Sequence, residues 1–113
     1  MTGRLPTHVW VDALRRHVNG RGDFAAILKK GERSGGAVLL DVRDRTGLHT
    51  LLSRVNLGDG RSEWRALAEN EAEDSDKIRK ILENQTRYDP DLWLIELDIA
   101  DAARFIVDLP ALS

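Results

Sequence analysis

The sequence has no cysteine among its 113 residues. This absence excludes disulfide bonds, zinc sites built on thiolates and cysteine nucleophiles. No run approaches the roughly 18 apolar residues of a membrane-spanning helix, and the N-terminal stretch lacks the apolar core of a signal peptide. We therefore expect a cytoplasmic protein with no membrane partner.

Aromatic residues and proline are scarce: aromatic residues make up 5% of the chain, and there are three prolines. Apolar residues reach 42% and charged residues 32%, which is the balance of a globular protein rather than a disordered one. A chain of this length fits one domain and can bury a core without covalent cross-links. We predict a single domain over residues 1–113, with a loose lead-in at 1–7 and a tail at 108–113.

The charged residues are unevenly placed, although the net charge is only −2. Residues 1–65 carry 12 Lys and Arg against 7 Asp and Glu, whereas residues 66–113 carry 5 against 12. Such asymmetry can mark a surface for nucleic acid or for an acidic partner. It also arises when two halves of one fold pack together and offset each other, and we favour this second interpretation.

The most informative stretch surrounds Pro90, where a helical pattern gives way to the most apolar strand pattern. Proline lacks a backbone N–H and disfavours helical geometry in the residue before it, so the helix must end near Asp89. Residues 92–97 alternate between two faces that are both largely apolar, which predicts a central strand. The structural anchor of the fold is predicted to consist of Arg87, Tyr88, Asp89, Pro90, Asp91 and Trp93.

The rest of the chain reads as one helix, four strands and a second helix. Helical periodicity predicts the first helix over His8 to Asn19, ended by Gly20. The second helix begins at Asp74 or Ser75, and the pattern after residue 98 leaves helix, edge strand and tail open for residues 99–113. The four strand-like runs, which short turns join as an antiparallel meander, are 24–29, 36–42, 48–55 and 62–68.

These elements predict an α+β fold in the order α-β-β-β-β-α-β. We expect an antiparallel sheet of about five strands with two helices packed on one face. The expected core consists of Trp10, Leu14, Phe24, Ile27, Val38, Leu40, Leu51, Trp64, Ile81, Leu82, Trp93, Ile95 and Leu97.

No pattern of catalytic or ligand-binding residues is visible in the sequence. His8 and Asp12 share a helix face at i and i+4, but no third metal ligand accompanies them. The acidic run from Glu69 to Asp76 lacks the spacing of a calcium loop. No serine lies in a G-x-S-x-G setting, and the glycine-rich turns lack the Lys-Ser/Thr of a phosphate loop. We expect no enzymatic activity, no cofactor and no metal.

Basic residues at two predicted hairpin tips are the least ordinary feature. In the predicted meander both tips lie at the same end of the sheet, where five cations can meet phosphate oxygens. Interleaved aromatic residues for base stacking are missing, and solvated charged tips also discourage edge pairing between sheets. The candidate binding surface consists of Lys29, Lys30, Arg33, Arg61 and Arg65.

Three motifs span almost the full length of the chain: Trp10-Val11-x-Ala13-Leu14-x-Arg16, Gly35-Gly36-Ala37-Val38 and Arg87-Tyr88-Asp89-Pro90-Asp91-Leu92-Trp93. In these motifs, and most specifically in the last, the chain resembles the bacterial domain-of-unknown-function family 1491, short proteins found chiefly in alphaproteobacteria. The resemblance implies a single-domain bacterial protein. It implies no activity, substrate or catalytic residue.

The absence of a catalytic constellation and the charge asymmetry favour a non-enzymatic binding or adaptor module. We predict that it acts through a protein–protein or self-association surface. The alternative is nucleic-acid binding through the basic hairpin end, which predicts an affinity that falls steeply with salt.

Overall fold

The computed structural model of the protein describes residues 6–58, 61–72 and 74–109 and has an α+β fold, as the sequence predicted. No described helix is both long enough and apolar enough to cross a membrane. The elements in chain order are α1 (Thr7–Gly20), β1 (Phe24–Lys29), β2 (Val38–Arg43), β3 (His49–Gly58), β4 (Arg61–Glu71), α2 (Asp76–Tyr88), β5 (Trp93–Asp98) and α3 (Ala102–Asp108).

The five strands form one sheet in the order β1-β5-β2-β3-β4. The β2-β3-β4 part is the predicted antiparallel meander, but β1 and β2 do not form a hairpin. Instead β5 lies between them, antiparallel to β1 and parallel to β2, so the sheet is mixed rather than purely antiparallel. A parallel pair needs a long crossover connection, which β3, β4 and α2 supply. The inner position suits β5 because it is the most apolar run.

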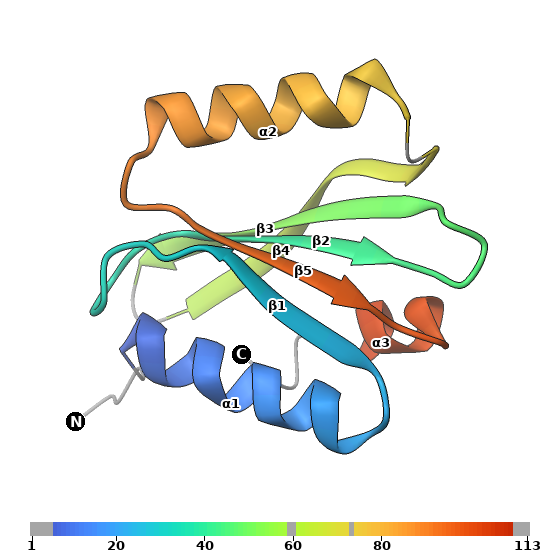
Figure 1. The fold of residues 1–113 in the computed structure, drawn as a ribbon. Coiled ribbons are helices and arrows are strands. Elements are labelled where there is room, and N and C mark those ends of the chain that lie inside the picture. The colour runs from blue at the N-terminus through green and yellow to red at the C-terminus, as the bar shows by residue number, and fades with distance from the viewer. Residues whose placement is uncertain (1–5, 59–60, 73, 110–113) are drawn as a thin grey trace.

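The helices cover both faces of the sheet rather than one (Figure 1). Helices α1 and α3 lie on one face, where Trp93, Ile95 and Leu97 of β5 join the main core. Helix α2 lies on the opposite face and packs over Leu92 and Leu94. The expectation of two helices on one face is therefore corrected. A strand that is apolar on both faces must be covered on both, and only α2 is available for the second face.

Most of the predicted core is buried, with one clear exception. Phe24 is 54% exposed, because β1 is an edge strand and no helix covers its outward side chains. Ile27, Trp64, Ile81 and Leu82 are partly buried at the margins of the core. The predicted core residues that are buried are Trp10, Leu14, Val38, Leu40, Leu51, Trp93, Ile95 and Leu97.

The segment after β5, which the sequence left open, turns back as α3. The Asp101 carboxylate accepts a hydrogen bond from the Arg104 N–H at the start of this helix, and Phe105 and Leu109 pack into the core between α3 and the sheet. Residues 108 and 109 of the expected tail therefore belong to the packed part of the fold. At the other end, Thr7 of the expected lead-in belongs to α1 and is buried, while residues 1–5 and 110–113 lie outside the described part.

Candidate functional site

The turn at Pro90 is a junction of two segments that are distant in sequence, residues 29–36 and residues 90–93. The Lys29 ammonium donates hydrogen bonds to the carbonyl oxygens of Pro90, at 2.6 Å, and Leu92, at 3.1 Å. The Trp93 indole N–H donates to the Glu32 carbonyl oxygen at 2.7 Å. These bonds fix the loop between β1 and β2 against the start of β5. Two residues of the sequence motif, Pro90 and Trp93, therefore both contact the segment that follows β1 or ends it.

Two glycines of this junction leave no space for a side chain. A Cβ on Gly31 or Gly36 would collide with the Asp91 backbone oxygen. Between them, the Glu32 carboxylate accepts hydrogen bonds from the Gly35 N–H, at 2.6 Å, and from Ser34. The hydrogen bond from Gly35, followed by those from Ser34, holds the pKa of the Glu32 carboxyl below its ordinary value. The glycine-rich loop is therefore closed by its own glutamate.

The predicted anchor residues divide between this junction and the surface. Helix α2 ends at Tyr88, and the Asp89 N–H donates to the Gln85 carbonyl oxygen, as expected for a helix stopped before proline. The Asp89 carboxylate accepts from the Asp91 N–H within the turn. The side chains of Arg87 and Tyr88 point to solvent, and Tyr88 is 79% exposed.

The predicted basic surface is split between the two edges of the sheet. Lys29 pairs in register with Leu94 of β5, and Arg65 pairs with Ser53 of β3. Both pairs lie in the same row across the sheet, but β1 and β4 are its opposite edge strands. Four inter-strand spacings separate them, which is about 19 Å between backbones. The two groups of basic residues thus lie at the same end of the sheet but do not form one cluster.

Part of that basic charge is already engaged within the fold. The Lys29 ammonium contacts two carbonyl oxygens, and the Arg65 guanidinium lies 2.7 Å from the Glu63 carboxylate. Lys30 and Arg33 are exposed on the loop that follows β1. The exposed cations therefore number fewer than the sequence suggested.

The helical His8 and Asp12 pair does not come together as metal ligands. The Asp12 carboxylate contacts Arg15 at 2.7 Å and Arg16 at 2.8 Å, and the hydrogen bond from Arg15 keeps the pKa of Asp12 below its ordinary value. His8 Nδ1 lies 3.0 Å from the Arg33 carbonyl oxygen. Across the described ranges, no three His, Asp or Glu side chains are placed to hold a metal ion.

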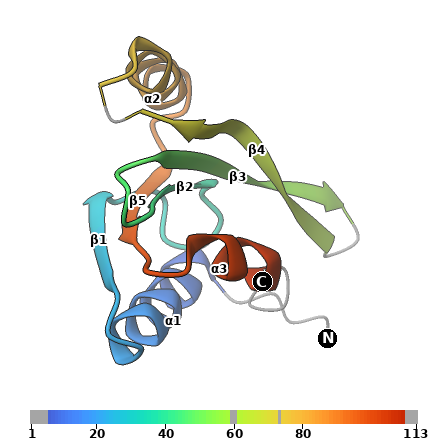
Figure 2. The same cartoon turned by 90° about the vertical axis from the view of Figure 1, so that its right-hand side faces the viewer.

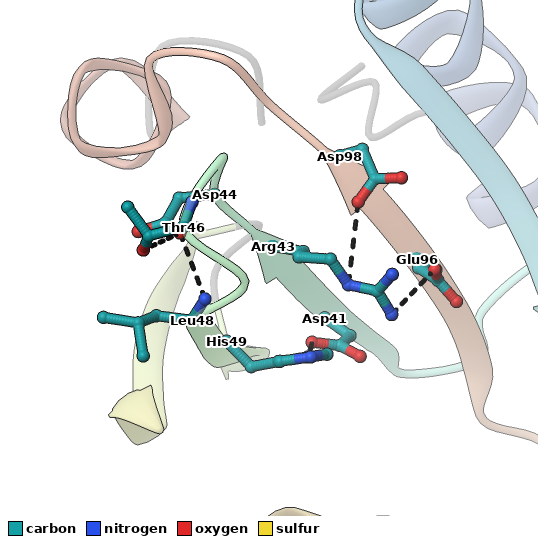
Figure 3. Close-up of polar contacts among 8 residues, drawn as sticks. All are labelled: Asp41, Arg43, Asp44, Thr46, Leu48, His49, Glu96 and Asp98. Atoms are coloured by element: carbon teal, nitrogen blue, oxygen red, sulfur yellow. Dashed lines mark hydrogen bonds and ion pairs between the residues drawn. The ribbon is translucent and has the colours of Figure 1, made fainter. Parts of the chain in front are cut away.

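A buried polar pair, Asp41 and His49 (Figure 3), lies on the sheet face that carries α2, because Asp41 alternates with the core residues Leu40 and Val42 of the other face. Asp41 is 5% exposed, His49 is 4% exposed, and His49 Nδ1 lies 2.7 Å from the Asp41 carboxylate. His49 Nε2 is buried and has no hydrogen-bond partner among the described residues. The sequence reasoning missed this pair. The available signal was Asp41 itself, which interrupts the apolar run of β2.

A group of ion-paired side chains lies next to this pair, near the end of β5 (Figure 3). The Arg43 guanidinium lies 3.2 Å from the Glu96 carboxylate and 3.7 Å from that of Asp98. Beyond it, the Asp44 carboxylate closes the β2–β3 turn by accepting hydrogen bonds from Thr46 and Leu48. The hydrogen bond from the Thr46 side chain, followed by that from Leu48, holds the pKa of the Asp44 carboxyl below its ordinary value.

The polar side chains of this sheet face connect neighbouring strands. A histidine oriented by a carboxylate is one part of a general base. Here, however, the free nitrogen of His49 is enclosed, so it cannot approach a substrate in this conformation. The salt bridges of Arg43 join the parallel strands β2 and β5.

A hollow of about 290 Å³ lies between the end of α1 and α3. Its apolar lining includes Val18, Ile99 and Phe105, and charged side chains of both signs surround it. Its carboxylates already have structural partners: Asp23 accepts from the Ala100 N–H, and Asp108 pairs with Arg104. The third carboxylate of the lining, Asp101, accepts from the Arg104 N–H, so all three carboxylates serve the local structure.

The β1 edge carries two large apolar side chains that are half-exposed. Phe24 and Leu28 are each 54% exposed, and Leu28 lies at a register shift between Ile27 and Lys29. In Figure 2, β1 is the outermost strand, with no other described element beyond it. The Ala25 N–H turns away from β5 and donates instead to the side-chain oxygen of Asn19, at 3.2 Å. The sequence reasoning missed this surface because it placed Phe24 in the core.

Comparisons with known proteins identify close structural relatives. The family described as "Protein of unknown function (DUF1491)" matches residues 5–107. The crystal structure of a DUF1491 family protein from Caulobacter crescentus CB15 is 34% identical, with a TM-score of 0.77 over 88% of this chain and 92% of that one. Its NMR structure gives a TM-score of 0.76 at the same identity, covering 88% and 91%.

A third solved structure, of protein Atu0922 from A. tumefaciens, is 28% identical. Its TM-score is 0.74, and the match covers 86% of this chain and 87% of that one. A comparison with curated proteins found no match. The fold is therefore shared with these bacterial proteins over nearly their whole length.

Proposed function

The chain belongs to the DUF1491 family, and because that family is described as one of unknown function, we propose a function from the surface of the protein itself: it is a non-enzymatic binding module that pairs a polypeptide strand with β1. The observation that carries the proposal is an unpaired edge strand bearing two half-exposed large apolar side chains, Phe24 and Leu28. An open strand edge is a template for pairing with another chain.

The other edge of the sheet supports the choice of β1 by contrast. Strand β4 carries exposed charged residues, including Arg61, Glu63 and Arg65, and its pairing with β3 is interrupted by three register shifts. Charges and bulges are the usual means by which proteins block an open edge. Strand β1 has a single register shift, at Leu28, and carries no charged residue from Phe24 to Leu28, so it lacks the protection that charged side chains give.

Nucleic-acid binding through the predicted basic surface gains less support. Lys29 is engaged with carbonyl oxygens, and Arg65 lies on the far edge of the sheet. The binding of a polypeptide at β1 needs neither residue. The nucleic-acid alternative keeps its own test, which is a steep loss of affinity with added salt.

Site-specific photocrosslinking in the source cell tests the proposal. Leu28 is replaced by the photoreactive residue p-benzoylphenylalanine, and Val107, which is 74% exposed on α3, is replaced in a matched control. We expect a protein adduct from position 28 and none of that mass from position 107. No adduct at position 28, or the same adducts from both positions, would overturn the proposal.

A further inference from the structure

Resting on the proposed function, we infer that the strand received by β1 is β1 of a second copy of this chain, paired antiparallel about a two-fold axis at Ala26. A contact of this kind is self-complementary, since the same strand supplies both sides. The inference follows from the backbone, the apolar side chains and the charges of residues 22–30, which all fit this one register.

The backbone groups on the open side of β1 fit the two-fold arrangement. The Ala25 N–H points away from β5, as its bond to Asn19 shows. In an antiparallel ladder the outward groups belong to alternate residues, so those of Ile27 also face the open side. An axis at Ala26 sets Ala25 opposite the partner's Ile27, and the two residues exchange N–H and C=O hydrogen bonds. The symmetric pair repeats them, giving four new bonds in exchange for the Ala25–Asn19 bond of each copy.

The exposed apolar side chains are brought together in the same register. An axis at Ala26 sets Phe24 opposite the partner's Leu28, and Leu28 opposite the partner's Phe24. Leu28 lies at the register shift, where a bulge re-aims the side chain, and directly opposed residues are close enough for two side chains of this size to meet. Both side chains are 54% exposed in the single chain, so each contact removes apolar surface from water.

The charges that flank the strand are complementary across the axis. Asp23 falls opposite the partner's Lys29, and Gly22 falls opposite the partner's exposed Lys30. No two like charges oppose each other between residues 22 and 30. Because the Lys29 ammonium and the Asp23 carboxylate already have partners within their own chain, the charges permit this register by the absence of repulsion and add no new ion pair.

Neighbouring registers that keep the same backbone bonding are poorer. An axis at Ile27 would set Phe24 opposite the partner's Lys30 and Ala25 opposite the partner's Lys29. An axis at Ala25 would set Asp23 opposite the partner's Ile27. Each choice places a charged side chain against an apolar one and separates Phe24 from Leu28. The register at Ala26 is the one in which apolar meets apolar and acid meets base.

The absence of cysteine from the chain allows a direct test with single introduced cysteines. At the axis, Ala26 and the partner's Ala26 form a non-hydrogen-bonded pair with Cα atoms about 4.5 Å apart, which suits a disulfide. Phe24 lies four residues from the partner's Phe24, about 14 Å along the strand, which a disulfide cannot span. The full-length Ala26→Cys, Phe24→Cys and Leu28→Cys variants are oxidised mildly and examined by mass spectrometry without reductant.

We expect Ala26→Cys to become almost completely a disulfide-linked dimer. Phe24→Cys and Leu28→Cys alone should stay unlinked, and their mixture should give the mixed dimer. Circular dichroism of each reduced variant confirms that it is folded. An unlinked Ala26→Cys variant, or linkage of Phe24→Cys with itself, would overturn this register. If position 28 meanwhile photocrosslinks to a different protein, the second-copy inference fails while the proposed function stands.

Discussion

The ammonium of Lys29 lies 2.6 Å from the carbonyl oxygen of Pro90, which is 61 residues further along the chain. This contact fastens the end of β1 to the turn that starts β5. It shows that the Pro90 turn acts as a tertiary junction as well as a helix stop. The same lysine also reaches the Leu92 carbonyl oxygen.

Lys29→Ala should lower the free energy of unfolding by about 1.5–3 kcal/mol, because two hydrogen bonds from a charged donor are lost. Lys30→Ala is the matched control, since Lys30 is the next residue and its side chain is exposed. This substitution should change stability by less than about 0.5 kcal/mol. Urea unfolding followed by tryptophan fluorescence measures both. Equal effects of the two substitutions would show that the Lys29 contact does not stabilise the junction.

Gly36→Ala should destabilise the protein by about 1–3 kcal/mol, as overpacking does. The new Cβ would collide with the Asp91 backbone oxygen, and a backbone atom cannot turn aside as a side chain can. Gly20→Ala is the opposite case, because nothing lies near its Cβ at the end of α1. That change should stabilise by about 0.4–1 kcal/mol by reducing the freedom of the unfolded chain. Thermal unfolding of both variants should shift in opposite directions, and shifts of the same sign would contradict this reading.

His49→Ala should cost about 3–5 kcal/mol, since it leaves the Asp41 carboxylate buried without its partner. The double variant Asp41→Leu/His49→Leu removes both polar groups together and should cost less than the single change. Urea unfolding of the single and double variants provides the comparison. A double variant less stable than His49→Ala would show that the two side chains stabilise the fold by more than offsetting the cost of each other's burial.

The Pro90 motif was the best guide that the sequence offered to the fold. Proline chemistry located the end of α2, and two-sided apolar alternation identified β5 as a central strand, both of which the structure confirms. The partners of β5 were not predictable in the same way. Local pattern indicates neighbours joined by short turns, whereas the insertion of β5 between β1 and β2 depends on contacts between residues 55 to 74 positions apart in the sequence.

The insertion of β5 between β1 and β2 explains the other differences between the predicted and the observed fold. Once β5 occupies the inner position, β1 becomes an edge strand, and Phe24 moves from the expected core to the surface. The basic tips are separated for the same reason, since Lys29 and Arg65 now lie on opposite edges. The Asp41–His49 pair was hidden because the two residues meet only across the β2–β3 ladder.

Protonation of Asp44 should destabilise the β2–β3 turn in acid. Its folded-state pKa is lowered, first by the hydrogen bond from the Thr46 side chain, so the ionised form stabilises the fold above the ordinary value near 4. This contribution is lost as the pH falls through the lowered pKa. Urea unfolding between about pH 2 and pH 7 should therefore show a shallower acid loss for Asp44→Asn than for the wild type. Thr46→Ala should reduce the loss in part, whereas three parallel curves would exclude Asp44 as a contributor.

Asn19 is predicted to restrain self-association by occupying the Ala25 N–H in the single chain. Pairing through β1 must break this bond, so Asn19→Ala should increase the fraction of dimer at a given concentration while slightly destabilising the monomer. Sedimentation equilibrium measures the dimer fraction, and Arg16→Ala, an exposed change on the same helix, is the control. An unchanged dimer fraction for Asn19→Ala would mean that the Ala25 N–H does not take part in pairing. Because the Ala26→Cys disulfide reports the register and Asn19→Ala reports the backbone bond, the two results test separate features of the same interface.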